Sequence, residues 1–234
     1  MTVIIIKLVA VVVIGYLLGS IPVGYLLGRR QGKVDVRTYG SGKTGAANVF
    51  RTAGRKWGLL VAVLDICKGA LAVVIAGFIV RGDYLLVGDS SLWWLFTSAQ
   101  VLAALAAVTG HIWSVFLGFK GGRGVATFFG GLVALCPVAA LFGGEVLIIG
   151  AGLTRFVSLG SLAGAVGSYA ILVPLTILNG FPVEYLFYAV VGGVIIFFMH
   201  RDNIRRLMSG KERRLGDKAD EVRLPPSGAT KGAK

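Results

Sequence analysis

Long apolar segments decide what kind of fold this chain can adopt. Six of them lie along the sequence, at residues 3–28, 58–80, 93–110, 128–153, 159–178 and 184–199. Apolar runs of about 18 residues or more are typical of helices that span a membrane. The composition agrees, because 56% of the 234 residues are hydrophobic and only 15% are charged. The sequence therefore predicts an all-α polytopic integral membrane protein with no room for a sizeable soluble domain.

The distribution of basic residues predicts how the bundle is oriented. The loop at 29–57 carries eight Lys and Arg residues against one acid, Asp35, and ten more follow from Arg201 onward. Because loops rich in Lys and Arg stay in the cytoplasm, we expect the N-terminus outside and the C-terminus in the cytoplasm. In a soluble chain the net charge of +13 would suggest nucleic acid. Between spans it more simply sets topology and attracts anionic membrane lipids, so no nucleic-acid partner is predicted.

The second basic loop, at 110–127, and the basic tail are both expected in the cytoplasm, so an even number of membrane crossings must separate them. Three apolar stretches lie between them, and Pro137 and the pair Gly143–Gly144 are expected to break the stretch at 128–153. We therefore expect two short or re-entrant helices that turn back to the cytoplasmic side, which makes a seven-helix bundle. Pro22 should kink the first span. The membrane domain would cover residues 1–210, and the basic tail at 211–234 is predicted to be disordered.

Two charged residues interrupt the second apolar stretch. Asp65 and Lys68 lie three positions apart, so both project from one helical face and are able to pair. Charges at membrane depth usually face the interior of the bundle. The spacing leaves two interpretations open, a structural brace and a direct role in a site. Cys67 and Cys136 have no CxxC or His/Cys neighbours, and we interpret both as packing residues rather than metal ligands or disulfide partners.

Two glycine-rich basic loops carry the strongest functional signal. The first, at 40–51, has three glycines in its first six residues, with Lys43 and Arg51 as cationic donors. The second places Lys120 and Arg123 on either side of a glycine pair. A freely turning backbone with basic side chains suits phosphate, because N–H groups and cations converge on it. Basic residues that only anchor the bundle are the alternative, but anchoring does not explain the paired glycines.

A third basic stretch follows the last apolar segment. His200 ends that segment, and Asn203 lies one turn later on the same helical face. Ser158 and Ser161 follow Arg155, and we expect them near the same cytoplasmic side. Together with the two loops, these residues form a set that suits polyanions carrying more than one phosphate group.

Residues 40–51, 111–127 and 200–210 closely resemble the three motifs of the bacterial acyl-phosphate-dependent glycerol-3-phosphate acyltransferase family (PlsY). The resemblance implies an enzyme of the bacterial cytoplasmic (inner) membrane whose active site faces the cytoplasm. It further implies acylation of glycerol 3-phosphate at position 1 by a fatty acyl phosphate, giving lysophosphatidate and phosphate. Neither a cofactor nor a metal is implied, and the expected partners are the two substrates and membrane lipids.

The resemblance also implies roles for individual residues. Those implied to be catalytic are His200, Asn203, Lys120 and Arg123. Those implied to bind substrate are Ser41, Gly42, Gly45, Asn48, Arg51, Gly121, Gly122, Gly124, Ser158 and Ser161. Three positions depart from the pattern of the family, since Lys43, Ala47 and Arg123 stand where it usually has Asn, Thr and Lys. The last departure keeps the charge but changes its shape.

The residues also suggest a mechanism. No Ser-His-Asp or Cys-His set is evident, which argues against a covalent acyl-enzyme. We hypothesise direct attack of the glycerol hydroxyl on the acyl carbonyl, with cationic residues stabilising the departing phosphate. Either that phosphate or His200 would take the hydroxyl proton.

Two other functions remain open at the level of the sequence. One is a membrane transporter or channel for phosphate or a small organic phosphate, although the basic site lies on one face only and no inverted repeat is visible. The other is a lipid-binding scaffold, which would not need convergent glycine-rich loops.

Overall fold

The structure is all-helical, and its helices run side by side along one long axis. This computed structural model describes residues 2–87, 93–217 and 219, with the backbone alone at 81–87. Ten α-helices account for most of these residues: α1 (Thr2–Ser20), α2 (Val23–Gln31), α3 (Ala46–Thr52), α4 (Arg55–Val87), α5 (Trp93–Ile112), α6 (Val125–Leu135), α7 (Pro137–Thr154), α8 (Val157–Asn179), α9 (Val183–Met199) and α10 (Arg201–Met208). Two short 3₁₀ helices, η1 (Val36–Thr38) and η3 (Val115–Leu117), lie in the connections.

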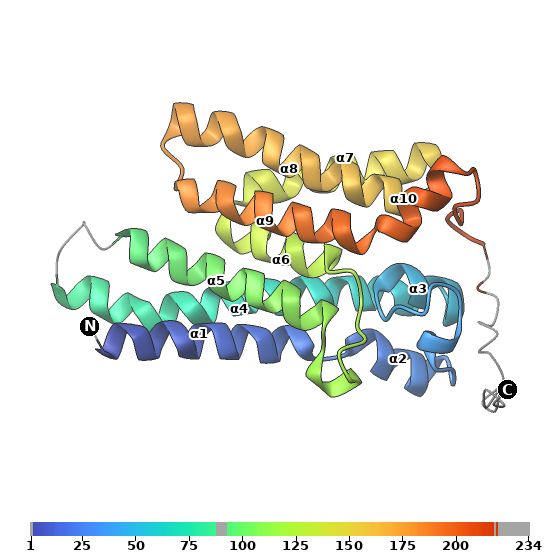
Figure 1. Ribbon diagram of the computed structural model, residues 1–234, viewed down its shortest axis with the longest axis horizontal. Helices are drawn as coiled ribbons and strands as arrows, with labels where there is room; N and C mark the ends of the chain where they lie inside the picture. The colour runs from blue at the N-terminus through green and yellow to red at the C-terminus, as the bar shows by residue number, and fades with distance from the viewer. Residues whose placement is uncertain (1, 88–92, 218, 220–234) are drawn as a thin grey trace, which may run out of the picture.

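The long helices form two groups with α6 between them (Figure 1). One group is α1, α4 and α5, and the other is α7, α8 and α9. The larger core lies where these groups meet, around Phe128, Leu132 and Tyr188, whose side chains are buried. The short helices α2, α3 and α10 gather at one end of the molecule, while the start of α1 lies at the opposite end. The polar chemistry of the chain is therefore concentrated at one end of an apolar bundle.

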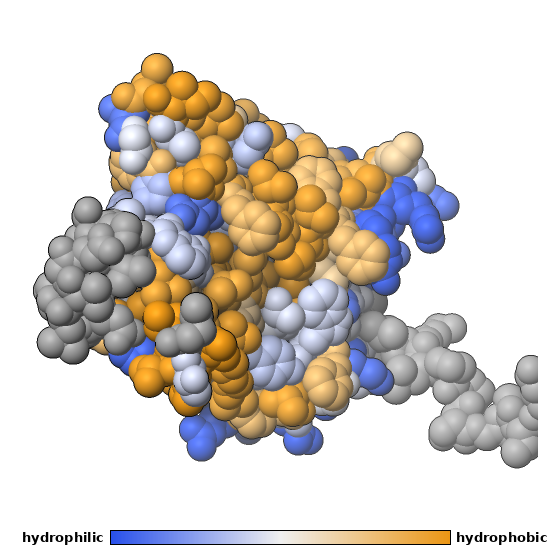
Figure 2. Space-filling view, turned by 60° about the vertical axis from the view of Figure 1, so that its left-hand side comes forward, coloured by the Kyte–Doolittle hydropathy of each residue, from blue (hydrophilic) through white to orange (hydrophobic). Residues whose placement is uncertain are grey.

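The outer surface of the bundle is mostly apolar, as expected of a protein that faces lipid. Side chains such as Ile148 and Leu178 are 69% and 77% exposed. Figure 2 shows hydrophobic residues over most of one face, with most of the strongly hydrophilic ones at its margins. Among the described residues, five helical segments are long and apolar enough to cross a membrane, and the bent pair α9–α10 would be a sixth. The helix α6 is apolar but shorter. How many segments cross stays a prediction.

The two proline breaks are found where the sequence predicts them. Helix α1 ends at Ser20 and α2 begins at Val23, so the first span is interrupted at Pro22. Helix α6 ends before Cys136, and Pro137 opens α7 at a position where its missing N–H costs nothing. Helix α7 then brings the chain back to the end where α10 lies. The carbonyl of Arg155, which follows α7, accepts there from the N–H of Leu215 at 2.6 Å.

The predicted break at Gly143–Gly144 is wrong, because α7 runs through both residues without interruption. Gly143 instead allows close packing: a side chain there would collide with Ser168 and with the Gly164 carbonyl on α8. Small residues at such positions let membrane helices approach closely. Helix α4 also continues to Val87, so its backbone extends past the apolar segment at 58–80. Residues 88–92, which follow it, lie outside the described part of the chain.

Candidate functional site

The first basic loop is a rigid structure built around the amide of Asn48. This side chain is 3% exposed, and its Nδ2 atom donates to three loop carbonyls at 2.7, 3.1 and 2.9 Å, those of Val36, Tyr39 and Lys43. Its Oδ1 atom accepts from the N–H of Ser41 at 3.1 Å. Gly40 and Gly42 take positive φ angles of 56° and 65°, which side chains disfavour. The loop is therefore held in one shape before any ligand arrives.

Arg51 projects from α3 at the end of this loop. Its Nη2 atom contacts the carbonyl oxygens of Arg213 and Arg214 at 3.4 Å, while its buried Nε has no hydrogen-bond partner among the described residues. Burial, together with the charge of Arg213, lowers the pKa of Arg51 below its ordinary value. Lys43 also has a lowered pKa, through burial first and then through the charges of Arg123 and Arg201. The first loop thus faces the second loop and α10.

The second loop folds back onto the end of α5. The N–H groups of Gly121 and Gly122 donate to the carbonyls of Ile112 and His111 at 2.9 and 3.0 Å. Gly124 has a φ of 86° and caps α6, so the chain turns sharply into that helix. Arg123, just before this turn, points its Nε into the protein without a hydrogen-bond partner among the described residues. By contrast, Lys120, just before the glycine pair, is exposed.

His200 and Asn203 lie where α9 meets α10 at a bend of 60°. Both are buried, at 2% and 4% exposure. The Nδ1 atom of His200 lies 2.8 Å from the carbonyl oxygen of Ile196, so this nitrogen is assigned the proton and Nε2 is left as the acceptor in the neutral ring. Arg123 lies close enough to His200 for its positive charge to disfavour protonation of the ring. The second loop and the α9–α10 junction therefore meet.

Glu212 joins this group, although no local sequence pattern points to it. Its side chain is 4% exposed and accepts from Asn203 Nδ2 at 2.6 Å, Ser158 Oγ at 2.9 Å and Arg206 Nε at 2.8 Å. Ser161, by contrast, donates within α8 to the carbonyl of Val157 at 2.8 Å. The one sequence feature that could have pointed to Glu212 is its place as a lone acid between Lys211 and Arg213, in the stretch predicted to be a tail.

Three arginines give the site its charge. Arg51, Arg123 and Arg206 come from α3, the second loop and α10, and each has a buried nitrogen without a hydrogen-bond partner in the described part of the chain. Burial and the neighbouring charge of Arg206 lower the pKa of Arg123 from 12.5 to about 10, so it remains a cation at neutral pH. Buried unpaired donors are costly, and an anion with several acceptor oxygens would satisfy them.

We expect Glu212→Gln to destabilise the fold in a pH-dependent way. Burial tends to raise the pKa of Glu212, but hydrogen bonds from Asn203, Ser158 and Arg206 outweigh it and lower the pKa below 4.5. The ionised carboxylate therefore stabilises the fold above pH 4.5, and this contribution is lost as the pH falls through the lowered pKa. Losing one charge-assisted bond should cost about 2 kcal/mol.

The measurement is the thermal midpoint of unfolding in detergent, for both proteins, at pH 7 and near pH 4. The wild type should have a clearly higher thermal midpoint than the variant at pH 7, and the difference between the two midpoints should be smaller near pH 4. An equal gap at both values would contradict the role of the charge.

Comparisons with known proteins agree in sequence and in structure. The family model described as glycerol-3-phosphate acyltransferase matches residues 9–210. A relative named glycerol-3-phosphate acyltransferase 3, from Dehalococcoides mccartyi (strain CBDB1), is 62% identical over 91% of this chain and 98% of its own length. A glycerol-3-phosphate acyltransferase from Synechococcus sp. (strain JA-3-3Ab) is 47% identical over 87% of this chain and 91% of its own.

Two crystal structures of PlsY (YgiH), an integral membrane glycerol 3-phosphate acyltransferase, have a similar fold. The glycerol 3-phosphate form superposes with a TM-score of 0.75 at 40% identity, covering 89% of this chain and 96% of that one. The lysophosphatidic acid form gives a TM-score of 0.73 at 39% identity, covering 89% of this chain and 95% of that one.

Proposed function

The chain belongs to the glycerol-3-phosphate acyltransferase family, and we propose that it transfers a fatty acyl group from a fatty acyl phosphate to the 1-hydroxyl of glycerol 3-phosphate. It is an acyltransferase and a membrane protein, as its relatives and the PlsY structures are. Glycerol 3-phosphate and lysophosphatidic acid, present in the two PlsY structures, are the acceptor and the product of this reaction. The names of these relatives and structures identify the acceptor and the product. The acyl phosphate donor is inferred from the sequence motifs, and a transporter role is not retained.

The observation that carries the proposal is the convergence of Arg51, Arg123 and Arg206 with unpaired buried donors. The proposed reaction brings two phosphate groups together, one on the acceptor and one on the donor. Two such anions repel each other unless cations separate them, and the three guanidinium groups supply such cations, with the carboxylate of Glu212 beside them. Arginine also binds phosphate oxygens through two N–H groups at once.

In this proposal the acceptor hydroxyl attacks the acyl carbonyl carbon directly. A new C–O ester bond forms, and the bond between the carbonyl carbon and the phosphate oxygen breaks. Arg123 and Lys120 stabilise the charge that grows on the departing phosphate. Phosphate, whose second pKa is about 6, takes the hydroxyl proton as it leaves. His200 and Asn203 position the glycerol 3-phosphate, with His200 Nε2 as the competing proton acceptor.

The remaining predicted residues fall into two groups in this proposal. The residues that contact substrate phosphates through side chain or backbone are Ser41, Gly45, Arg51 and Gly124. The residues that shape the site instead, because their N–H or hydroxyl groups donate within the protein, are Gly42, Gly121, Gly122, Ser158 and Ser161. Asn48 acts indirectly, since its polar atoms are committed to the loop backbone. Glu212 is added as the residue that orients Asn203 and Ser158. Residues 1–210 form the catalytic domain, and the first residues of the predicted tail complete the site.

The orientation in the membrane follows from the end at which these residues gather. Both basic loops, α10 and Arg155 lie together, at the end opposite to the start of α1. By the positive-inside rule, this end faces the cytoplasm of the bacterial inner membrane and the N-terminus lies outside. A cytoplasmic site would receive soluble glycerol 3-phosphate, while the acyl chain lies between helices open to the bilayer.

The test is phosphate release by purified protein given palmitoyl phosphate, with and without glycerol 3-phosphate. We expect release that depends on glycerol 3-phosphate, with lysophosphatidate formed in equal amount and no reaction from palmitoyl-CoA. An Arg123→Met protein, purified in the same way, controls for spontaneous hydrolysis and contaminating enzymes. Activity with the CoA ester alone would refute the donor assignment.

A further inference from the structure

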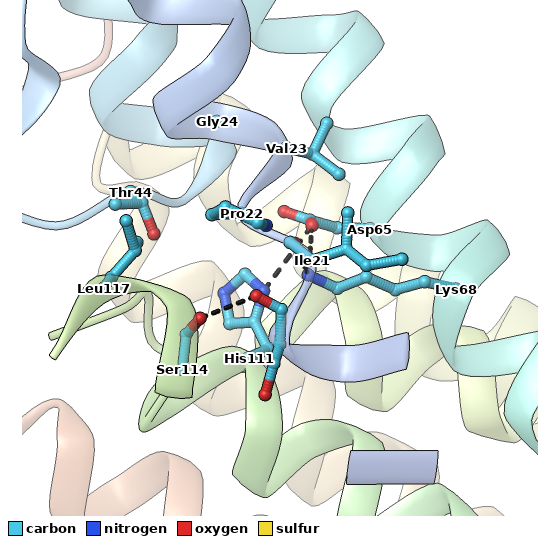
Figure 3. A pocket seen from close by; sticks show the side chains of 11 residues that line it. Ile21, Pro22, Val23, Gly24, Thr44, Asp65, Lys68, His111, Ser114 and Leu117 are labelled. Atoms are coloured by element: carbon cyan, nitrogen blue, oxygen red, sulfur yellow. Dashed lines mark hydrogen bonds and ion pairs between the residues drawn. The ribbon is translucent and has the colours of Figure 1, made fainter. Parts of the chain in front are cut away.

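A buried ionic cluster lies next to the site but takes no part in the reaction proposed above (Figure 3). Asp65 Oδ1 lies 2.8 Å from Lys68 Nζ and 3.5 Å from His111 Nδ1. The three side chains are 2%, 7% and 6% exposed. Asp65 and Lys68 lie on α4, and His111 lies in the last turn of α5. Ionisable groups inside a membrane bundle are expensive to bury and are usually retained for a function.

One end of the cluster is tied to the break in the first span. Lys68 Nζ donates to the carbonyl oxygen of Ile21 at 3.1 Å, just before Pro22. Ser114, which follows α5, donates from its Oγ to the carbonyl of Ser20 at 2.6 Å. Thr44 of the first loop lines the same narrow cleft. The cluster is therefore held on three sides by elements that are already fixed.

The other end supports the second loop. The backbone carbonyl of His111 accepts from the N–H of Gly122 at 3.0 Å. The imidazole also lies against this glycine, so closely that a Cβ at position 122 would collide with His111 Nε2. No positive φ is required at Gly122, so the imidazole, rather than backbone conformation, excludes a side chain there. Arg123 is the next residue, and the position of the ring fixes where its backbone starts.

We propose that Asp65, Lys68 and His111 act as positioning residues. They hold the second loop, and with it Arg123, in the position from which Arg123 contacts the substrate phosphate. Lys68 anchors the Asp65 carboxylate to the α1–α2 break, and Asp65 orients the ring of His111 through Nδ1. The ring then supports Gly122 from below. The inference rests on the proposed function, because the loop matters through the phosphate that Arg123 holds. This role differs from both interpretations that the sequence leaves open, because the cluster does more than brace the fold and yet does not contact the substrate.

A double-mutant cycle between His111 and Gly122 tests the contact directly. Gly122→Ala places a methyl group against the ring and should lower kcat/KM about 100-fold, since a displacement of about 1 Å has that effect. His111→Ala removes the support and should lower kcat/KM at least tenfold. In the double variant the methyl group fills the vacated space. Its kcat/KM should therefore be at least tenfold higher than the value expected if the two single losses were simply multiplied. Independent, multiplicative effects would overturn the proposal.

A second pair of substitutions separates positioning from stability. Asp65→Leu with Lys68→Met removes both charges, a change that buried ion pairs often tolerate without loss of stability. Positioning predicts folded protein whose kcat/KM is at least tenfold lower, because the ring of His111 has lost its partner. A brace alone predicts wild-type kcat/KM per folded molecule, and that result would overturn the inference. Thr97→Val, a buried threonine at the other end of α5, is the matched control and should leave kcat/KM unchanged.

A readout without turnover distinguishes this inference from the proposed function. Inorganic phosphate should raise the thermal midpoint of the wild-type protein, and the rise should shrink at least by half in the Asp65→Leu, Lys68→Met variant. An undiminished rise in that variant would overturn the inference. Wild-type protein that is folded but inactive with every donor would overturn the proposed function instead. If the charge-free pair does not fold, the cycle at His111 and Gly122 still decides, because both of its sites leave the ion pair in place.

Discussion

Arg123→Met should abolish most of the activity, lowering kcat/KM about a thousandfold, as loss of a preorganised charge in an active site does. Arg123 is the deepest cation of the second loop, and its Nε faces inward with no hydrogen-bond partner among the described residues. Methionine keeps the length and apolar volume of the side chain, so the loss should come from charge rather than packing. Kinetics in detergent, with both substrates varied, measure the effect.

Arg123→Lys is the informative control for this substitution. Lysine restores the charge but starts from a pKa about two units below that of arginine, and the same burial and the same neighbouring Arg206 would lower it further. The wild-type guanidinium, with its pKa at about 10, stays charged across the working range. The lysine variant should therefore be active at neutral pH and should lose activity at lower alkaline pH than the wild type. Superimposable pH profiles would contradict the role of this charge.

Asn48→Ala should disrupt the first loop and cost about 3 kcal/mol of stability or more, since each buried group left unpaired costs about 1–3 kcal/mol. The amide is the shared partner of three carbonyls and one N–H, and no neighbouring side chain replaces it. Activity should fall together with stability, because Ser41 and Arg51 border the same loop. The thermal midpoint and kcat/KM measured on the same preparations give the result.

Two further variants show whether the donors of Asn48 matter. Asn48→Asp keeps the shape but replaces the donating group with an acceptor, so we expect a loss at least as large as in the alanine variant. Thr52→Val is the matched control, because Thr52 only donates within α3, to the carbonyl of Asn48 at 3.0 Å. It should behave like the wild type. A stable, active Asn48→Asp protein would show that the loop does not depend on this amide.

The sequence predicted the features that local chemistry controls. The apolar stretches became helices, and Pro22 and Pro137 interrupted them where a missing N–H and a fixed φ require it. The positions of the two glycine-rich loops between helices also follow from local composition. The prediction for Gly143–Gly144 failed because glycine serves equally in a break and in close helix packing, and only the neighbouring helix α8 distinguishes the two.

Contacts between distant segments were not predictable in the same way. Asp65 and Lys68 were expected to pair, since they lie one turn apart, but His111 comes from another helix. The amide of Asn48 was interpreted as a ligand for phosphate, whereas its hydrogen bonds go to its own loop. Glu212 was placed in a tail, because nothing local shows that Ser158, Asn203 and Arg206 surround it. The substrate roles of the individual residues stay predictions.

By itself, then, the sequence determined an apolar helical bundle, the places where its helices break, and the phosphate chemistry concentrated in its basic loops. These depend on hydropathy, proline and charge, which act over a few neighbouring residues. The tertiary structure decided which cations meet, which acid opposes them and which buried pair supports the loop. Those outcomes depend on residues as many as 163 positions apart, as Arg51 and Arg214 are. Packing of the whole bundle, rather than any local pattern, brings such residues within a few ångströms of each other.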